Sequence, residues 1–318
     1  MSDIHEDSSK TRAKTKLLRD FGPIVMAALH DSKTIEIMLN ADGKLWQERL
    51  GEEMRCIGKM AAEKAEAIIK TVAGYHHKEI TRLKPTIEGE LPLDGSRFAG
   101  QLPPVVDAPT FAIRKKAVSV FTIEQYVEAG IMTVEQCNAI KKAISAHRNI
   151  LVIGGTGSGK TTLVNAIINQ MVVGAPKERI FIIEDTGEIQ CTAENFVQYH
   201  TTLEVSMTML LKTTLRMRPD RILVGEVRGP EALDLLMAWN TGHEGGAATL
   251  HANNARSGLD RLLMLISMHS DSPREIEPLI GEAVHMIVHI ARTPEGRRVQ
   301  EILMVSGYAD GKYSLHSL

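Results

Sequence analysis

The stretch Gly154-Gly-Thr-Gly-Ser-Gly-Lys-Thr161 has the spacing of a phosphate-binding loop: four residues separate two glycines, and a lysine and a hydroxyl residue follow. It comes directly after the apolar run Asn149-Ile-Leu-Val-Ile153 and before a helix-like segment, residues 162–170. A strand, a glycine-rich turn and a helix N-terminus direct several backbone N–H groups at one point, where an anion can bind. The sequence therefore predicts that this chain binds a nucleoside triphosphate.

Each residue type in the loop meets a need of a bound triphosphate. Glycines let the backbone curl around the phosphates without clashes from Cβ atoms. Lys160 would reach the β- and γ-phosphates, and Thr161 would bind Mg²⁺ through its hydroxyl. The predicted cofactors are thus ATP and Mg²⁺. The predicted nucleotide-binding residues are Gly154, Gly155, Thr156, Gly157, Ser158, Gly159, Lys160, Thr161 and Thr162.

Length and composition limit the rest of the interpretation. The chain has 318 residues, more than twice a typical domain of ~150, so two domains are expected. Apolar residues make up 43% and charged residues 24%, as in ordinary globular proteins, and a net charge of −2 argues against a surface that binds nucleic acid throughout. No apolar run approaches the ~18 residues of a membrane span, and the acidic start does not resemble a signal peptide. We therefore expect a cytoplasmic protein.

A change in pattern divides the chain into two parts. Residues 1–14 are polar and mixed in charge, and we expect them to be disordered. Residues 15–117 begin with a β-hairpin pattern at 34–49, followed by a helical pattern at 60–70. Short strand-like stretches broken by proline and glycine then fill residues 86–114. These features predict a small α+β N-terminal domain.

Residues 118–318 alternate between strand-like and helix-like segments. Two helix starts with capping-box spacing, Thr122-x-x-Gln125 and Thr133-x-x-Gln136, precede the strand that leads into the phosphate loop. Alternating strands and helices predict a mostly parallel sheet between two layers of helices, a three-layer α/β domain. The other predicted strands are 179–183, 221–224 and 246–250, with an antiparallel addition at 286–290 and 298–305.

Acidic and histidine side chains follow three of these strands, at the sheet edge where ligands gather in α/β proteins. Glu184 and Asp185 could hold Mg²⁺ through water, and which of the two leads there stays open. Glu226 could orient or deprotonate the attacking water, and we favour it as the hydrolytic residue. His251 could sense the γ-phosphate. The structural alternatives are ion pairs with nearby arginines such as Arg228 for the acids, and a structural hydrogen bond for His251.

The cysteine and histidine spacing does not indicate a further metal site. Cys56, Cys137 and Cys191 form no C-x-x-C pair. His243-Glu-Gly-Gly lacks the second histidine that a zincin helix requires. We therefore expect reduced thiols and neither a disulfide nor a zinc site.

Four ordered motifs together resemble those of the secretion and traffic ATPases. They are the phosphate loop, the acidic box Ile183-Glu-Asp-Thr-Gly-Glu188, the Gly-Glu-Val-Arg-Gly motif within residues 215–232 and the Thr-Leu-His-Ala motif within residues 241–253. The likeness is nearest to the conjugal transfer ATPases of the TrbB type, relatives of the ring ATPases that energise type IV secretion. With the N-terminal stretches that also fit, it covers most of residues 30–310.

The resemblance implies a fold, an activity and roles at matching positions. It implies a RecA-like P-loop ATPase domain after a smaller α+β domain, with ATP hydrolysis that drives conjugative DNA transfer, type IV secretion and pilus biogenesis. By position, Glu184 belongs to the acidic box, Glu226 ends the Walker B strand and His251 belongs to the histidine box. Arg97 and Arg114 resemble the arginines that approach the γ-phosphate when the two domains close. The alternative for each arginine is a surface or inter-strand salt bridge.

The same resemblance implies the partners. They are a homohexameric ring with nucleotide between the two domains, the other components of a conjugation or type IV secretion membrane complex, and peripheral contact with the inner membrane. No amphipathic basic helix is evident in the sequence, so membrane contact rests on the resemblance alone. The missing four-cysteine zinc module favours the compact conjugation or type IV secretion branch.

Other classes of function stay open. An arginine cluster within residues 216–228 suggests a nucleic-acid translocase, but 4% aromatic residues leave little for base stacking, which argues against direct nucleic-acid binding. A nucleotide-gated scaffold would bind ATP and assemble with negligible turnover, and the variant Glu226→Gln would separate it from a motor. A metabolite kinase is a weaker hypothesis, because the Gly-Glu-Val-Arg-Gly and Thr-Leu-His-Ala motifs would have no role in it.

Overall fold

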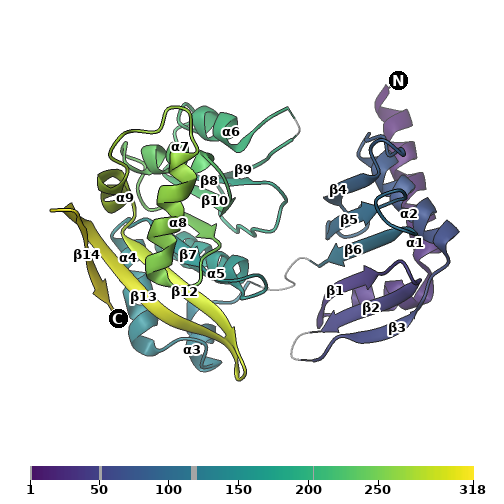
Figure 1. Cartoon of the computed structure of the whole chain (residues 1–318), viewed down its shortest axis with the longest axis horizontal. Helices are drawn as coiled ribbons and strands as arrows, with labels where there is room; N and C mark the ends of the chain where they lie inside the picture. Colours follow the sequence, from purple (N-terminus) through teal and green to yellow (C-terminus); the bar gives the residue numbers. More distant parts are fainter. Residues whose placement is uncertain (1, 50–51, 116–119, 203) are drawn as a thin grey trace. The chain divides into compact units, whose positions relative to one another are not determined.

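The computed structural model describes residues 2–49, 52–115, 120–202 and 204–318. The chain divides into two compact units, Met1–Val118 and Ser119–Leu318 (Figure 1). The boundary that the sequence predicted, between residues 117 and 118, falls outside the described residues.

The N-terminal unit is a six-stranded antiparallel sheet with the order β3-β2-β1-β6-β5-β4. Its strands are β1 (Thr34–Leu39), β2 (Lys44–Arg49), β3 (Arg55–Lys59), β4 (Thr86–Glu90), β5 (Arg97–Gln101) and β6 (Thr110–Arg114). Its helices are α1 (Ser2–His30) and α2 (Ala62–Tyr75). The predicted hairpin and the predicted helix at 60–70 are confirmed.

The core of this unit lies on one face of the sheet, under the two helices. Alternate residues of the strands point inward, such as Phe98 of β5 and Ile113 of β6, and pack against Leu17 of α1 and Ile68 of α2. Because side chains alternate across a strand, the residues between them point to the opposite face. That face is where the predicted arginines of β5 and β6 lie.

Helix α1 departs from the disorder expected for residues 1–14, since the chain is helical from Ser2 onward. Leu17 and Phe21 are buried in the core of the unit and anchor the helix. A helix anchored at one end extends readily through good helix formers such as Lys and Ala, and polar composition alone does not reveal that anchor. Gly22, with φ 69° and ψ 179°, and Pro23 kink the helix.

The C-terminal unit is an eight-stranded sheet with the order β14-β13-β12-β7-β11-β10-β8-β9. Its strands are β7 (Ile150–Ile153), β8 (Ile180–Glu184), β9 (Phe196–His200), β10 (Arg221–Val227), β11 (Ala247–Leu250), β12 (Met286–Thr293), β13 (Gly296–Ala309) and β14 (Lys312–Ser317). Its helices are α3 (Ile123–Glu128), α4 (Val134–Ser145), α5 (Lys160–Gly174), α6 (Met207–Thr214), α7 (Glu231–Trp239), α8 (Ala255–Ser267) and α9 (Glu277–Ala283).

The strand directions correct one expectation. β12 pairs in parallel with β7, so it belongs to the parallel part of the sheet, and only β13 and β14 are antiparallel additions. The predicted strands at 179–183, 221–224 and 246–250 are confirmed as β8, β10 and β11. Both predicted capping boxes also form, at the starts of α3 and α4.

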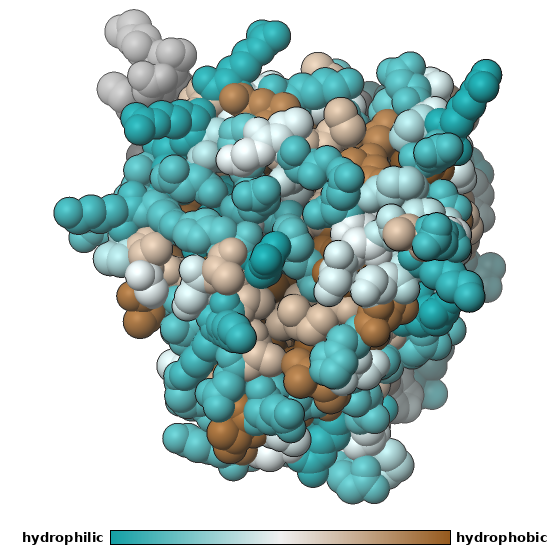
Figure 2. Space-filling view, turned by 90° about the vertical axis from the view of Figure 1, so that its left-hand side faces the viewer, coloured by the Kyte–Doolittle hydropathy of each residue, from teal (hydrophilic) through white to brown (hydrophobic). Residues whose placement is uncertain are grey.

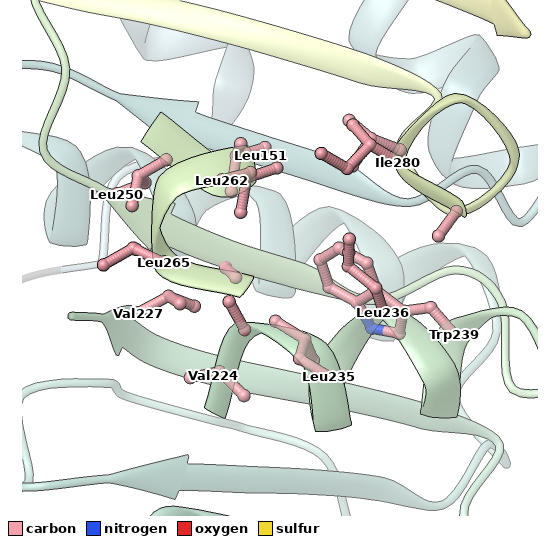
Figure 3. Packing of buried hydrophobic residues seen from close by; sticks show 14 of the residues in the cluster. Leu151, Val224, Val227, Leu235, Leu236, Trp239, Leu250, Leu262, Leu265 and Ile280 are labelled. Atoms are coloured by element: carbon pink, nitrogen blue, oxygen red, sulfur yellow. The ribbon is translucent and has the colours of Figure 1, made fainter. Parts of the chain in front are cut away.

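Two apolar clusters cover the two faces of this sheet. One cluster joins the strands to α6, α7, α8 and α9, and the other joins them to α3, α4 and α5. Figure 3 shows the first cluster, where Leu235 and Trp239 of α7 and Leu262 of α8 lie among side chains of the sheet. Strands buried on both faces need continuous apolar sequence, which explains why these strands lack alternation.

The surface of the molecule contrasts with these clusters. On the face in Figure 2 hydrophilic residues predominate, and the hydrophobic ones lie in small separate groups. Within the described part of the chain, no helix is both long enough and apolar enough to cross a membrane.

Candidate functional site

The phosphate loop joins the end of β7 to the first residue of α5. Gly159 precedes α5 with a left-handed φ of 98°, which glycine adopts without strain. At Gly154 a Cβ atom would lie 2.1 Å from the carbonyl oxygen of Ile290 in β12, so a side chain has no room there. These two positions require glycine, and the absence of side chains there lets the loop pack closely against β12.

Lys160 lies over the start of this loop and is only 8% exposed. Its ammonium donates to the carbonyl oxygens of Gly154 and Gly155, each at 3.0 Å. Lys160 is the first residue of α5, and the N-terminus of this helix adds partial positive charge. A cation and a helix N-terminus at one glycine-rich turn form an anion site of the kind that the sequence predicted.

Thr161 and Glu188 approach each other beside the loop. The Thr161 hydroxyl donates to Oε2 of Glu188 over 3.4 Å. Across the described residues, no group of three or more His, Cys, Asp or Glu side chains could hold a metal ion by itself. Mg²⁺ suits such a place, because it binds through one or two protein oxygens together with nucleotide phosphates and water. The residues present therefore fit a nucleotide-bound Mg²⁺.

Glu184, at the end of β8, is enclosed by hydrogen-bond donors and is 2% exposed. Its Oε1 accepts from the backbone N–H groups of Glu188 and Ile189 at 3.0 and 2.8 Å. Its Oε2 accepts from Gln198 of β9 at 2.6 Å. Burial raises the pKa of Glu184, while these three hydrogen bonds lower it. Glu184 therefore anchors the loop after β8. Its buried, fully hydrogen-bonded carboxylate differs from the exposed carboxylate of a typical metal ligand.

Glu226 and Asp185 share one arginine. Arg228 donates from Nε to Oε2 of Glu226 at 2.8 Å, and a second donor from its NH2 group reaches the same oxygen. Another nitrogen of Arg228 lies 3.5 Å from Oδ2 of Asp185. The hydroxyl of Thr201 donates to the other oxygen of Asp185 at 2.8 Å. The arginine pairing left open by the sequence is thus present, but at Glu226 it occupies only one of the two carboxylate oxygens.

His251 bridges Glu226 and the phosphate loop. Its Nε2 lies 2.7 Å from Oε1 of Glu226, and its Nδ1 lies 3.4 Å from the Lys160 ammonium. Burial, followed by the charge of Lys160, lowers the pKa of His251, so the ring is neutral near pH 7. Oε1 of Glu226 is buried and accepts no well-aligned hydrogen bond from the described residues. One carboxylate oxygen therefore remains for a further donor.

The strands themselves hold these groups together. β10 and β11 are parallel neighbours, and the hydroxyl of Thr249 in β11 donates to the carbonyl oxygen of Gly225 in β10 at 2.6 Å. Glu226 follows Gly225 directly, and His251 comes two residues after Thr249. The arrangement places an acid, a neutral imidazole and a buried ammonium around one phosphate-binding loop, which suits hydrolysis of a phosphoric anhydride.

Comparison with known proteins identifies the family of this chain. The sequence pattern of the family described as type II/IV secretion system protein (T2SSE) matches residues 61–306. This chain belongs to that family. The predicted resemblance to secretion and traffic ATPases is thereby confirmed.

Two relatives and one solved structure illustrate the extent of the likeness. The probable conjugal transfer protein TrbB of Sinorhizobium fredii is 49% identical, over 97% of this chain and 94% of its own length. The type IV secretion system protein PtlH of Bordetella pertussis is 32% identical, over 87% of this chain and 90% of its own. The crystal structure of the Legionella pneumophila ATPase DotB superposes with a TM-score of 0.63 at 18% identity, covering 86% of this chain and 77% of that chain. The last likeness concerns the fold alone.

The two predicted arginines of this secretion family member lie side by side in the N-terminal unit. Arg97 of β5 and Arg114 of β6 are directly opposite in the antiparallel register, on the face away from the core. Nε of Arg114 also pairs with Oε1 of Glu36 in β1 at 2.5 Å, which is the inter-strand salt bridge considered as the alternative. The structure thus brings the arginines to each other, and their role at the nucleotide stays a prediction.

Some residues of the site were not predicted. Glu188 belongs to the acidic box, but its sequence position, four residues beyond the end of β8, does not indicate that it lies beside Thr161. Gln198 and Arg297 carry no motif signal, and only the fold brings them to Glu184 and to the phosphate loop. All the other candidates of the C-terminal unit, from Gly154 to His251, gather at the same edge of the sheet, after β7, β8, β10 and β11.

Proposed function

We propose that this protein is an ATP-hydrolysing motor that energises conjugative DNA transfer or type IV secretion. The observation that carries the proposal is the approach of Lys160, His251 and Glu226 to one another at the phosphate loop, over 3.4 and 2.7 Å. The conjugal transfer and type IV secretion proteins that the chain resembles support the biological setting.

The nucleotide is bound by residues 154–162, the loop and the first turn of α5. Lys160 neutralises charge on the β- and γ-phosphates. The Thr161 hydroxyl and the Glu188 carboxylate, which lie together, hold the magnesium side of the nucleotide, with Asp185 close by through water. Mg²⁺, when bound, would withdraw negative charge from the phosphate oxygens and so make the γ-phosphorus easier for water to attack.

Hydrolysis uses Oε1 of Glu226, the carboxylate oxygen that Arg228 does not hold. Oε1 accepts a proton from the attacking water as the water oxygen bonds to the γ-phosphorus and the bond to the β–γ bridging oxygen breaks. Arg228 holds the other oxygen and so orients the carboxylate. Neutral His251, between this oxygen and Lys160, reports the presence of the γ-phosphate. Glu184 supports the reaction indirectly, since it fixes the loop that carries Asp185 and Glu188.

The arginine pair of the N-terminal unit completes the proposed site. Arg97 and Arg114 lie directly opposite each other on neighbouring strands, so both guanidinium groups can approach one anion. We infer that Arg97 and Arg114 stabilise the γ-phosphate in the transition state when the two units close. The C-terminal unit then acts as a RecA-like ATPase domain, working in a homohexameric ring at the cytoplasmic side of a membrane complex.

ATP turnover per subunit, measured across a series of protein concentrations with light scattering at each point, tests this function. We expect turnover to rise as a hexamer forms, because a shared site is complete only in the ring. Lys160→Ala serves as the control and removes turnover at every concentration. Equal turnover by a monomer would contradict the ring motor and favour a simple nucleotidase.

A further inference from the structure

The hairpin of β12 and β13 contributes a side chain to the phosphate loop. Arg297, the second residue of β13, donates from Nε to the carbonyl oxygen of Gly157 at 3.3 Å. A Cβ atom at Gly159 would lie 3.0 Å from Cδ of Arg297, so the aliphatic stem of this arginine packs directly on that glycine. Ile290 of β12 backs Gly154 in the same way. The hairpin therefore supports the loop from end to end, and Arg297 covers its second half.

Arg297 makes no ion pair with any residue that the structure describes. Among the described residues its one hydrogen bond goes to a neutral carbonyl, and no carboxylate pairs with it. A guanidinium carries five N–H donors, and this bond uses one of them. The neighbour directly opposite across the hairpin is Arg292, a second positive charge.

The position of Arg297 along the loop indicates which part of a ligand it meets. Lys160 contacts the carbonyls of Gly154 and Gly155, at the start of the loop, and a lysine of this type reaches the β- and γ-phosphates. Arg297 lies at Gly157 and Gly159, where the loop turns into α5 and its backbone N–H groups cradle the α- and β-phosphates. Lys160 and Arg297 thus lie beside different parts of the phosphate-binding loop, and so beside different phosphates of a bound nucleotide.

We propose that Arg297 is a nucleotide-binding residue whose guanidinium binds the α- or β-phosphate of the nucleotide held in the phosphate loop. This assignment rests on the proposed nucleotide binding and adds to it a second cation from outside the loop and its helix. Because ADP retains both phosphates, Arg297 contributes equally to ATP and ADP affinity. It therefore sets how tightly nucleotide is held, whereas Glu226 sets how fast it is cleaved.

Equilibrium binding to the full-length variant Arg297→Gln tests the proposal. ATP, ADP and adenosine compete against a fluorescent ADP analogue, and a thermal melt without nucleotide monitors folding. We expect ATP and ADP each to bind about tenfold or more weakly, as loss of a charge-assisted hydrogen bond implies, with adenosine affinity and melting temperature unchanged. Arg298→Gln is the matched control, since the Arg298 side chain approaches Gly130 instead of the loop. Its affinities should equal those of the wild type.

A second variant separates charge from shape. Arg297→Lys keeps the positive charge without the planar fork, so we expect it to recover part of the lost ATP and ADP affinity. Unchanged affinity in Arg297→Gln would overturn the proposal. So would an equal loss for adenosine, or a Lys variant as weak as the Gln variant, because Arg297 would then only shape the loop. Failure of the wild type to bind any nucleotide would refute the proposed function instead, and the two failures are distinct.

Discussion

Two neighbouring strands of the C-terminal unit carry a glutamate at the same edge of the sheet, and their surroundings are opposite. Glu184 of β8 accepts hydrogen bonds on both oxygens from three protein donors. Glu226 of β10 is held on one oxygen by Arg228, while its other oxygen is buried without a well-aligned donor. An acid at the end of a buried strand can therefore be either an anchor or a reactive group, and its hydrogen bonds decide between the two roles.

The cause of the difference lies in the segments that follow each strand. After β8 the chain folds back so that the N–H groups of Glu188 and Ile189 reach Glu184, and Gln198 of β9 closes the other side. β10 instead lies between β8 and β11, and its glutamate pairs with two side chains, those of Arg228 and His251. Backbone donors are fixed in place, whereas side chains can yield to a ligand.

The largest effect on activity is expected at Glu226, the glutamate to which we assign proton transfer. Glu226→Gln removes the proton acceptor and should lower the rate of phosphate release about 10²- to 10⁴-fold, with ATP affinity retained. Steady-state phosphate release and fluorescent-nucleotide binding measure the two quantities. Wild-type turnover in this variant would exclude Glu226 from the mechanism and reverse the roles that we assign to the two glutamates.

Stability should respond to the other glutamate. Glu184→Ala leaves three buried donors without an acceptor and should lower the free energy of unfolding by about 3 kcal/mol or more. Glu226→Ala, whose main loss is a half-exposed ion pair, should cost less than about 1 kcal/mol. Urea unfolding in a Trp46→Phe background isolates the fluorescence of Trp239 in the C-terminal unit, since these are the two tryptophans. Equal losses of unfolding free energy in the two variants would contradict the anchoring role that we assign to Glu184 alone.

The loop that Glu184 anchors should determine how tightly Mg²⁺ binds. Glu188→Gln should raise the Mg²⁺ concentration for half-maximal turnover about 10- to 100-fold, because Glu188 shares the Thr161 hydroxyl. Asp185→Asn should raise it less, since Thr201 and Arg228 already occupy both oxygens of Asp185. A Mg²⁺ titration of phosphate release measures both. The reverse order would move the metal to Asp185.

The smallest effect concerns pH. Burial holds the pKa of Glu184 above its ordinary value of 4.5. Between 4.5 and that raised value the folded chain binds more protons than the unfolded chain, so the contribution of this group to stability falls as pH rises. The wild type should therefore gain stability relative to Glu184→Gln as pH is lowered through this window, as seen in urea midpoints. A difference that does not change with pH would place Glu184 in a more solvated environment.

Local patterns predicted much of the fold. The phosphate loop, the strand before it and both capping boxes depend on residues close in sequence, and the structure contains them where expected. The hairpin of β1 and β2 was visible for the same reason. Helix α1 was missed because its anchor, Leu17 against the N-terminal core, is a contact between distant residues. The parallel pairing of β12 with β7 likewise depends on the whole sheet.

Residue type and spacing alone reveal a phosphate-binding loop with Lys160 and Thr161, and the acids Glu184 and Glu226 at the ends of apolar strands. The fold adds that Glu184 is enclosed, that Arg228 holds one oxygen of Glu226, and that Arg297 reaches the loop from 140 residues beyond Gly157. The physical reason is that hydrogen bonding and burial are properties of the folded surroundings, and those surroundings come from strands far apart in the chain.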